Sequence, residues 1–206
     1  MAKLYDQAYF DRWYRDPRER VKDPREFVRK VQLALSMAEY YLGRPVESVL
    51  DVGCGEGHWR APLLAARPGL RYLGVDASSY AVQRFGRQRN LHRVAFAELP
   101  TLAERAGSVF GGAASVDLLV CSDVIHYLSA RDLARGLPAF SQLCQGVAWI
   151  EMFCRGDAFV GDDDGFIARP RAWYRRTLAR NGWLALGSNG WLSGDQRERA
   201  SMLELA

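Results

Sequence analysis

The sequence lacks any arrangement of cysteines and histidines that would hold a metal or define a disulfide framework. It contains four cysteines and three histidines. The cysteines form no C-x-x-C pair, and no histidine stands near one of them in a ligand pattern. We therefore expect reduced thiols and no structural metal.

Long apolar runs are also missing. No window approaches the roughly 20 uncharged apolar residues that a membrane span needs, and residues 1–6 lack the apolar segment of a signal peptide. A chain of 206 residues can bury one substantial core but is short for two full-sized α/β domains. We expect a single domain over residues 1–206, in the cytoplasm and without a membrane partner; the oligomeric state is left open.

Segregated charge is scarce as well. The net charge is only +4, and acidic and basic residues are mixed through residues 1–30. Purely basic stretches occur at Arg84–Arg93 and at Arg169–Arg180. Because such runs on exposed helices are usually solvated surfaces, we favour a protein that does not bind nucleic acid and keep RNA as an alternative partner.

The most informative stretch that the sequence does contain is residues 49–59. The apolar run Val49–Val52, interrupted by Asp51, is followed by glycines at 53, 55 and 57 and then by a segment suited to a helix over residues 58–67. This order is typical of a buried strand, a tight turn and a helix start. Glycines admit a ligand close to the backbone, and a helix N-terminus offers unpaired N–H groups, so a ligand pocket is expected here.

Further strands and helices alternate along the chain. We predict buried strands at residues 71–76, 93–96, 116–121 and 147–153, with helices between them that include one capped by Ser78. Near the end, residues 183–186 and 191–192 flank an Asn189–Gly190 hairpin signal. The pattern predicts a three-layer α/β/α sandwich with a mostly parallel seven-stranded sheet that ends in an antiparallel hairpin.

Helices are also predicted before the first strand, over residues 1–44. In residues 7–18, four aromatic residues at i,i+4 spacing favour a short amphipathic helix that either docks on the core or covers the pocket. A second helix is delimited by Asp23 and Pro24 at its start and by Gly43 at its end. These helices would occupy residues 1–44, ahead of an α/β core over residues 45–206.

Asp76 ends the second predicted strand. The carboxyl ends of parallel strands meet at one edge of the sheet, so Asp76 should lie beside the glycine turn, where it can accept hydrogen bonds from two ribose hydroxyls. The glycine spacing is G-x-G-x-G, whereas enzymes that bind dinucleotides use G-x-G-x-x-G. This spacing disfavours a dinucleotide.

At this point the chain resembles a known family. Residues 51–57, 74–78 and 117–128 are similar, in order and spacing, to successive motifs of the seven-stranded, class I methyltransferases that use S-adenosylmethionine. The resemblance covers residues 45–153 and is to the bacterial type that acts on small molecules. It implies S-adenosyl-L-methionine as the cofactor and a Rossmann-like fold.

The resemblance also implies a set of cofactor-binding residues. Gly53, Cys54 and Gly55 would let the cofactor approach the backbone, and Asp76, followed by Ala77, would hold its ribose. Glu98 and Leu99 would lie beside the adenine, and Ser122 would lie under the methionine moiety. Asp51 would help to hold the methionine ammonium, and Tyr14 would belong to a helical lid formed by residues 1–44.

Methyl transfer requires mainly that a nucleophile be held in line with the sulfonium and that water be excluded, so a base is optional. His126 is the first candidate for a base because an imidazole titrates near neutral pH. Glu151 and Asp123 are weaker candidates. The alternative is that His126 bonds to backbone and shapes the wall.

The segment Cys154–Arg171 is predicted to be a substrate loop, and Trp173 and Tyr174 are candidates for the acceptor pocket. We expect a methyltransferase that acts on an O, N or C nucleophile of a small molecule. The alternatives are a methyltransferase for RNA or protein, and an inactive module that binds S-adenosylmethionine.

Overall fold

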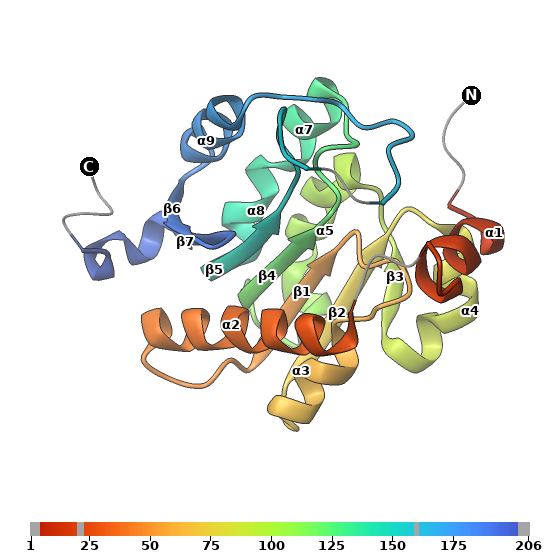
Figure 1. Ribbon diagram of the computed structural model, residues 1–206. Helices are drawn as coiled ribbons and strands as arrows, with labels where there is room; N and C mark the ends of the chain where they lie inside the picture. The colour runs from red at the N-terminus through yellow and green to blue at the C-terminus, as the bar shows by residue number, and fades with distance from the viewer. Residues whose placement is uncertain (1–4, 20–22, 159–160, 202–206) are drawn as a thin grey trace.

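The computed structural model describes residues 5–19, 23–158 and 161–201. Seven strands form one sheet in the order β3-β2-β1-β4-β5-β7-β6 (Figure 1). The first five are parallel, and β7 runs antiparallel to both β5 and β6. The strands are β1 (Ser48–Val52), β2 (Arg71–Asp76), β3 (Leu91–Arg93), β4 (Val116–Ser122), β5 (Cys144–Glu151), β6 (Trp183–Gly187) and β7 (Gly190–Ser193).

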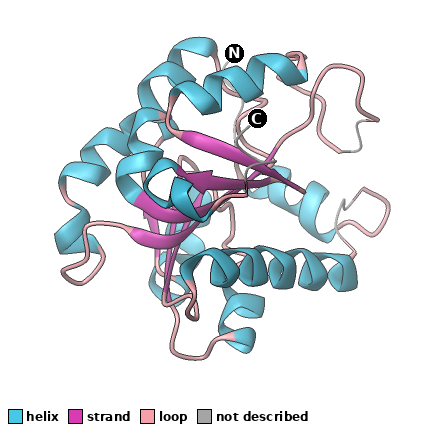
Figure 2. Ribbon diagram, turned by 90° about the vertical axis from the view of Figure 1, so that its left-hand side faces the viewer, coloured by secondary structure: helices cyan, strands magenta, loops and turns pink. Residues whose placement is uncertain are grey.

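Helices cover both faces of the sheet, as Figure 2 shows. Buried side chains form two clusters, one under the helices of each face. The helices of one face are α2 (Pro24–Leu42), α3 (Arg60–Ala66) and α4 (Ser79–Arg89), and those of the other are α5 (Leu99–Glu104), α6 (Ala106–Val109), α7 (Ala130–Gly136), α8 (Pro138–Leu143) and α9 (Arg171–Arg180). The predicted three-layer sandwich is confirmed. None of the described helices combines the length and apolarity that crossing a bilayer requires.

The N-terminal residues form two elements. A short helix, α1 (Gln7–Phe10), continues into a π-helical turn, η1 (Asp11–Arg15). Helix α2 then begins and ends where its sequence signals predict, because the Asp23 carboxylate accepts a hydrogen bond from the Arg25 N–H at 2.7 Å and Gly43 adopts a φ of +67°. In Figure 1, α1 lies on the side of the sheet to which the parallel strands point.

Two strand predictions are shifted along the chain. The third strand is Leu91–Arg93, because Phe96 already begins a 3₁₀ turn, η2 (Phe96–Glu98), that buries its ring in the core. The fifth strand starts at Cys144 rather than at Val147 and ends at Glu151. Short apolar runs do not by themselves fix strand ends, since their pairing with neighbours decides how far they extend.

The closing hairpin is confirmed, but its turn lies one residue earlier than the Asn-Gly signal indicates. The two residues between β6 and β7 are Ser188 and Asn189, with φ of +46° and +66°. Positive φ at both central residues is the geometry of a type I′ turn, which matches the twist of the flanking strands.

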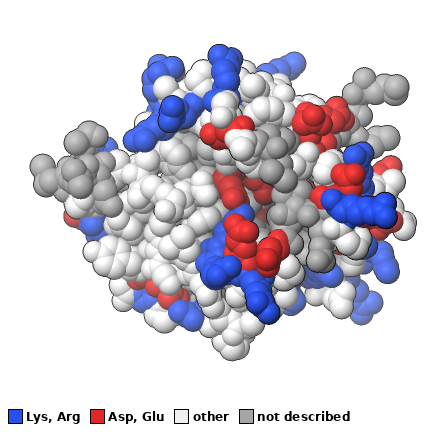
Figure 3. All heavy atoms as spheres, in the orientation of Figure 1, with Lys and Arg blue, Asp and Glu red and all other residues white. Residues whose placement is uncertain are grey.

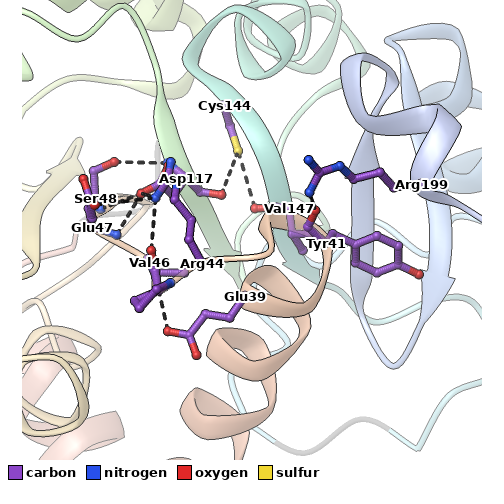
Figure 4. A network of polar contacts seen from close by, with 11 residues as sticks. Glu39, Tyr41, Arg44, Val46, Glu47, Ser48, Asp117, Cys144, Val147 and Arg199 are labelled. Atoms are coloured by element: carbon purple, nitrogen blue, oxygen red, sulfur yellow. Dashed lines mark hydrogen bonds and ion pairs between the residues drawn. The ribbon is translucent and has the colours of Figure 1, made fainter.

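The opposite edge of the sheet, where the parallel strands begin, is held together by Asp117 (Figure 4). One oxygen of its carboxylate accepts a hydrogen bond from Arg44 Nη2 at 2.6 Å, and the other accepts from the backbone N–H groups of Glu47 and Ser48 at 2.8 and 3.1 Å. Burial raises the pKa of this carboxyl, but the bonds from Arg44 and the backbone outweigh it and leave the pKa below its usual value. Asp117 thus joins the start of β4 to the segment that enters β1.

Candidate functional site

A cavity of about 570 Å³ lies at the carboxyl ends of the parallel strands. Its walls come from the glycine turn, the ends of β2, β4 and β5, the N-terminal elements, the start of α2 and the loop after β5. Acidic side chains lie at the centre of the view in Figure 3, with basic side chains directly beside them. The described lining residues are Tyr5, Tyr9, Phe10, Trp13, Tyr14, Asp23, Pro24, Glu26, Phe27, Lys30, Val52, Gly53, Gly55, His58, Asp76, Ala77, Val94, Phe96, Ser122, Asp123, Val124, Tyr127, Leu128, Glu151, Phe153, Gly161 and Asp162.

The glycine turn is built from conformations that side chains would prevent. Gly53 and Gly55 have φ of +69° and +53°. A Cβ on Gly53 would lie 2.3 Å from a methyl carbon of Val124, and one on Gly55 would lie 2.8 Å from the Tyr14 hydroxyl. The turn therefore needs glycine both for its backbone angles and for the close approach of its neighbours.

Asp76 faces this turn. Its two carboxylate oxygens accept hydrogen bonds from the N–H groups of Gly55 and Ser78, each at 2.7 Å. Burial raises the pKa of Asp76, and these backbone bonds reduce the rise. Each carboxylate oxygen has two lone pairs, so each can accept one further hydrogen bond from the cavity. The arrangement fits the paired hydroxyls of a ribose, which is what a bound nucleoside would present here.

The predicted adenine contacts are not brought to the cavity. Leu99 is fully buried in the core, and Glu98 is exposed, with its carboxylate accepting a hydrogen bond from the Ala95 N–H at 2.9 Å. Because η2 starts at Phe96, the residues that line the cavity after β3 are Val94 and Phe96. Sequence reasoning placed this wall a few residues too far along the chain.

Asp51 and Cys54 lie behind the turn rather than in the cavity lining. Both are buried, and the Asp51 carboxylate accepts a hydrogen bond from the Tyr72 hydroxyl at 2.7 Å. Burial raises the pKa of the Cys54 thiol well above its usual value. Tyr72, which sequence reasoning missed, thus supports the strand that carries the turn.

The N-terminal elements cover the glycine turn. The Tyr14 ring lies 4.6 Å from that of His58, measured between centroids, and Arg15 donates to the buried carboxylate of Glu56 at 2.6 Å. The Ser78 hydroxyl donates to the backbone carbonyl of Tyr5, also at 2.6 Å. Residues 7–18 line the cavity through aromatic side chains and also bury Phe10, so docking on the core and covering the pocket both remain predictions.

A polar network joins three elements at the other end of the cavity. Lys30, from α2, donates to both oxygens of Glu151 at the end of β5, at 2.7 and 2.8 Å. The hydroxyl of Ser122, at the end of β4, donates to the same carboxylate at 2.6 Å. The predicted residues Ser122 and Glu151 are therefore in direct contact, and Lys30 is a cavity residue that sequence reasoning missed.

Asp123 lines the cavity with an unusual backbone. Its φ of +61° is in the left-handed region, which costs an aspartate about 1 kcal/mol. Its N–H donates to the backbone carbonyl of Glu151 at 3.1 Å, and its carboxylate lies 3.3 Å from the Ser122 hydroxyl. Backbone strain of this kind concentrates at functional sites.

His126 is fully buried and does not line the cavity. Its Nδ1 accepts a hydrogen bond from the Phe153 N–H at 3.3 Å, and its ring centroid lies 4.2 Å from that of Tyr127. This placement agrees with the alternative interpretation, in which the histidine bonds to backbone and shapes the wall. Direct contact with a substrate at this position would need the wall to move.

The loop after β5 reaches the cavity through Gly161 and Asp162; residues 159 and 160 lie outside the described part. The Tyr127 hydroxyl donates to the backbone carbonyl of Asp162 at 2.5 Å. Buried Arg169 donates to the Leu128 carbonyl at 2.6 Å and so ties the end of the loop to the segment after β4.

Trp173 and Tyr174, which were candidates for the acceptor pocket, do not line the cavity. They flank the Arg169 guanidinium, at 4.7 and 5.9 Å from their ring centroids. Within the described residues, no group of three or more His, Cys, Asp or Glu side chains is placed to hold a metal ion.

Comparisons with known proteins agree with this geometry. A family model described as a methyltransferase domain matches residues 50–146. Ribosomal RNA small subunit methyltransferase G from Alkalilimnicola ehrlichii is 38% identical over 95 residues, which are 44% of this chain and 41% of that protein. The chain thus aligns with about two fifths of the length of this curated relative.

Two solved structures illustrate the likeness of fold. Magnesium protoporphyrin IX methyltransferase from Synechocystis, with bound SAH, has a TM-score of 0.57 at 20% identity, covering 88% of this chain and 87% of that one. A sugar N-methyltransferase from a Streptoalloteichus species has a TM-score of 0.60 at 18% identity, covering 89% and 85%.

Proposed function

We propose that this chain is an S-adenosylmethionine-dependent methyltransferase of the class I fold, and that it transfers the cofactor's methyl group to an O, N or C nucleophile of a small molecule. The observation that carries the proposal is the position of Asp76 beside the glycine turn, where Gly53 and Gly55 leave no room for a side chain. The carboxylate of Asp76 can accept hydrogen bonds from two hydroxyls in addition to those from the backbone.

Each part of the cavity has a proposed task. Asp76 holds the ribose, Gly53 and Gly55 admit the cofactor to the backbone, and Tyr14 closes over it. Val94 and Phe96 offer apolar contact for the adenine. Ser122, fixed by Glu151, lies where the methionine moiety would pass.

The bound cofactor supplies a methyl group that its sulfonium already activates. The protein's contribution is then to orient the nucleophile and to exclude water, for which the N-terminal cover and the loop after β5 are suited. Asp123 and Glu151 line the cavity and are the carboxylates placed to take a proton if one must leave. A role for His126 as general base remains a prediction, and turnover by His126→Ala that is intact across pH would refute it.

The decisive test is calorimetry with S-adenosylmethionine and with NAD, using wild type, Asp76→Ala and Asp117→Asn. S-adenosylmethionine should bind to wild type and to Asp117→Asn but not to Asp76→Ala, since Asp117 lies at the far edge of the sheet. Binding of NAD, or full retention of S-adenosylmethionine by Asp76→Ala, would refute the proposal.

The curated relative named above suggests RNA as a second acceptor class. Binding to RNA would weaken steeply with salt, because the phosphate backbone releases counterions on binding. Titration of the protein with a structured RNA at two salt concentrations tests this, and the absence of any salt-dependent affinity would exclude it.

A further inference from the structure

The charge of the cavity is opposite to that of the whole chain. The protein has 28 Lys and Arg against 24 Asp and Glu. The described residues that line the cavity nevertheless include one lysine and no arginine. Six of them are carboxylates: Asp23, Glu26, Asp76, Asp123, Glu151 and Asp162.

These carboxylates divide between the two ends of the cavity. Asp76 belongs to the ribose end. Lys30, the single lysine among the described lining residues, makes two hydrogen bonds to Glu151 and so offsets one carboxylate. Away from Asp76, the described lining residues still carry more negative than positive charges. The excess comes from Asp123 and Asp162 at the walls and from Asp23 and Glu26 at the start of α2.

The tyrosines of the same wall are held in their neutral form. The pKa of Tyr5 rises to about 12, through burial and then the charge of Asp162. The pKa of Tyr127 rises as well, from burial first and from Asp162 and Asp123 next. A negative carboxylate disfavours a second negative charge nearby, and for the same reason it favours a positive ligand.

The remaining wall is aromatic. Trp13, Phe27, Tyr127 and Phe153 line the cavity beside the carboxylates. The faces of aromatic rings carry negative charge density that attracts cations, and the rings also provide apolar contact area. The combination suits a ligand with an apolar body and a positive group.

We propose that the methyl acceptor is an amine that enters as a cation, with Asp123 as the anchor of its positive group. Before transfer the ammonium group gives one proton to the Asp123 carboxylate, from which it passes to solvent. The freed nitrogen lone pair then forms the bond to the methyl carbon while the bond from that carbon to sulfur breaks, and S-adenosylhomocysteine leaves. The inference rests on the proposed function, since it names the acceptor class for the same cavity. A polyanion such as RNA is disfavoured, because its phosphates would meet like charge at these carboxylates.

The test uses three probes of similar size and different charge: 2-phenylethylamine, 2-phenylethanol and 3-phenylpropanoate. Each is titrated by calorimetry into protein saturated with S-adenosylhomocysteine. The amine should bind about tenfold more tightly than the alcohol, and the carboxylate most weakly, as expected for one charge contact in a partly screened cavity.

Charge variants sharpen the test because they should act in opposite directions. Asp123→Asn should reduce the ratio of amine affinity to alcohol affinity about fivefold, whereas Lys30→Met should increase it. Glu104→Gln, an exposed residue of α5 outside the cavity lining, is the matched control and should leave the ratio unchanged. Retained binding of S-adenosylhomocysteine shows that each variant is folded.

Similar affinity for all three probes, or a preference for the carboxylate, would overturn the inference. So would amine binding that occurs only in the absence of S-adenosylhomocysteine, since the amine would then occupy the place of the cofactor itself. Failure of S-adenosylhomocysteine itself to bind to wild type would instead refute the proposed function.

Discussion

The two ends of the parallel strands use carboxylates in opposite ways. Asp117, at the start of β4, receives its hydrogen bonds from Arg44 and from the chain entering β1, and its pKa is lowered. Asp76, at the end of β2, receives backbone N–H groups and, among the residues that the structure describes, no arginine, and its pKa is raised. The first carboxylate is saturated by the protein, whereas the second keeps acceptor capacity that faces a cavity.

This contrast separates an acid that joins two segments of the sheet from the acid that we propose binds the ribose. Both accept two backbone hydrogen bonds, so the backbone alone does not distinguish them. The difference is the cation. The Arg44 guanidinium stabilises the charge of Asp117 within the fold, whereas we propose that a bound ligand donates further hydrogen bonds to the carboxylate of Asp76. Substitutions at the two ends should therefore separate binding from stability.

The largest effect is expected for Asp76→Ala. Loss of two hydrogen bonds from ribose hydroxyls to a carboxylate should weaken binding of S-adenosylmethionine at least about 100-fold, at about 1.5–3 kcal/mol per bond to a charged group. Calorimetry measures the change. If Asp76→Ala bound S-adenosylmethionine with an affinity within threefold of wild type, Asp76 would not differ from Asp117 in being available to a ligand.

A smaller effect, on stability, is expected for Asp117→Ala. The free energy of unfolding should fall by about 2 kcal/mol, because two backbone N–H groups lose their partner while Arg44, which is half-exposed, can turn to water. Denaturant unfolding measures it, with Glu47→Gln as the control, since that side chain is exposed. Equal stability of Asp117→Ala and wild type would contradict the assignment.

The pKa values of the two acids are shifted in opposite directions, so the two carboxylates should take up their protons in different pH ranges. The lowered pKa of Asp117 stabilises the fold above the ordinary aspartate value near 4, and this stabilisation is lost as pH falls through the lower folded value. The raised pKa of Asp76 means that it takes up its proton above the ordinary value. Cofactor affinity should therefore decline at a higher pH than stability does.

Unfolding and calorimetry across pH 3–7 measure the two profiles. Asp117→Asn should flatten the acid limb of the stability profile and leave that of cofactor affinity in place. A common midpoint for both profiles in wild type would contradict this prediction.

The smallest effect is expected at the N-terminal cover. Arg15→Ala removes the ion pair with Glu56, but the arginine is half-exposed and solvent screens the pair. The rate at which S-adenosylhomocysteine dissociates should rise about two- to fivefold, as for a contact of up to about 1 kcal/mol. Stopped-flow fluorescence measures the rate, and Arg12→Ala, which is more exposed, should change it little.

The contact between the glycine turn and Asp76 could be predicted from the sequence, because its determinants are local. The glycines and Asp76 are separated by one helix, and parallel strands must bring their carboxyl ends together. The ends of α2 and the presence of the closing hairpin could also be predicted, since helix caps and tight turns depend on adjacent residues.

The acceptor end was less predictable, because it depends on contacts across long separations. Lys30 meets Glu151 from 121 positions away and stands among other charged residues of α2 in the sequence. Glu98 and Leu99 were misplaced because a 3₁₀ turn, rather than a longer third strand, follows residue 95. His126 was placed near the correct strand end, but only packing shows that its ring turns into the wall.

The contact between Gly53 and Val124 has a further consequence. With no side chain on the glycine, Val124 fills the space against the turn, directly beside Asp123. The two ends of the cavity thus share one packed wall. Small shifts of the turn when the cofactor binds should reach the residue that we propose anchors the acceptor, so each ligand should alter the affinity of the other by the same factor.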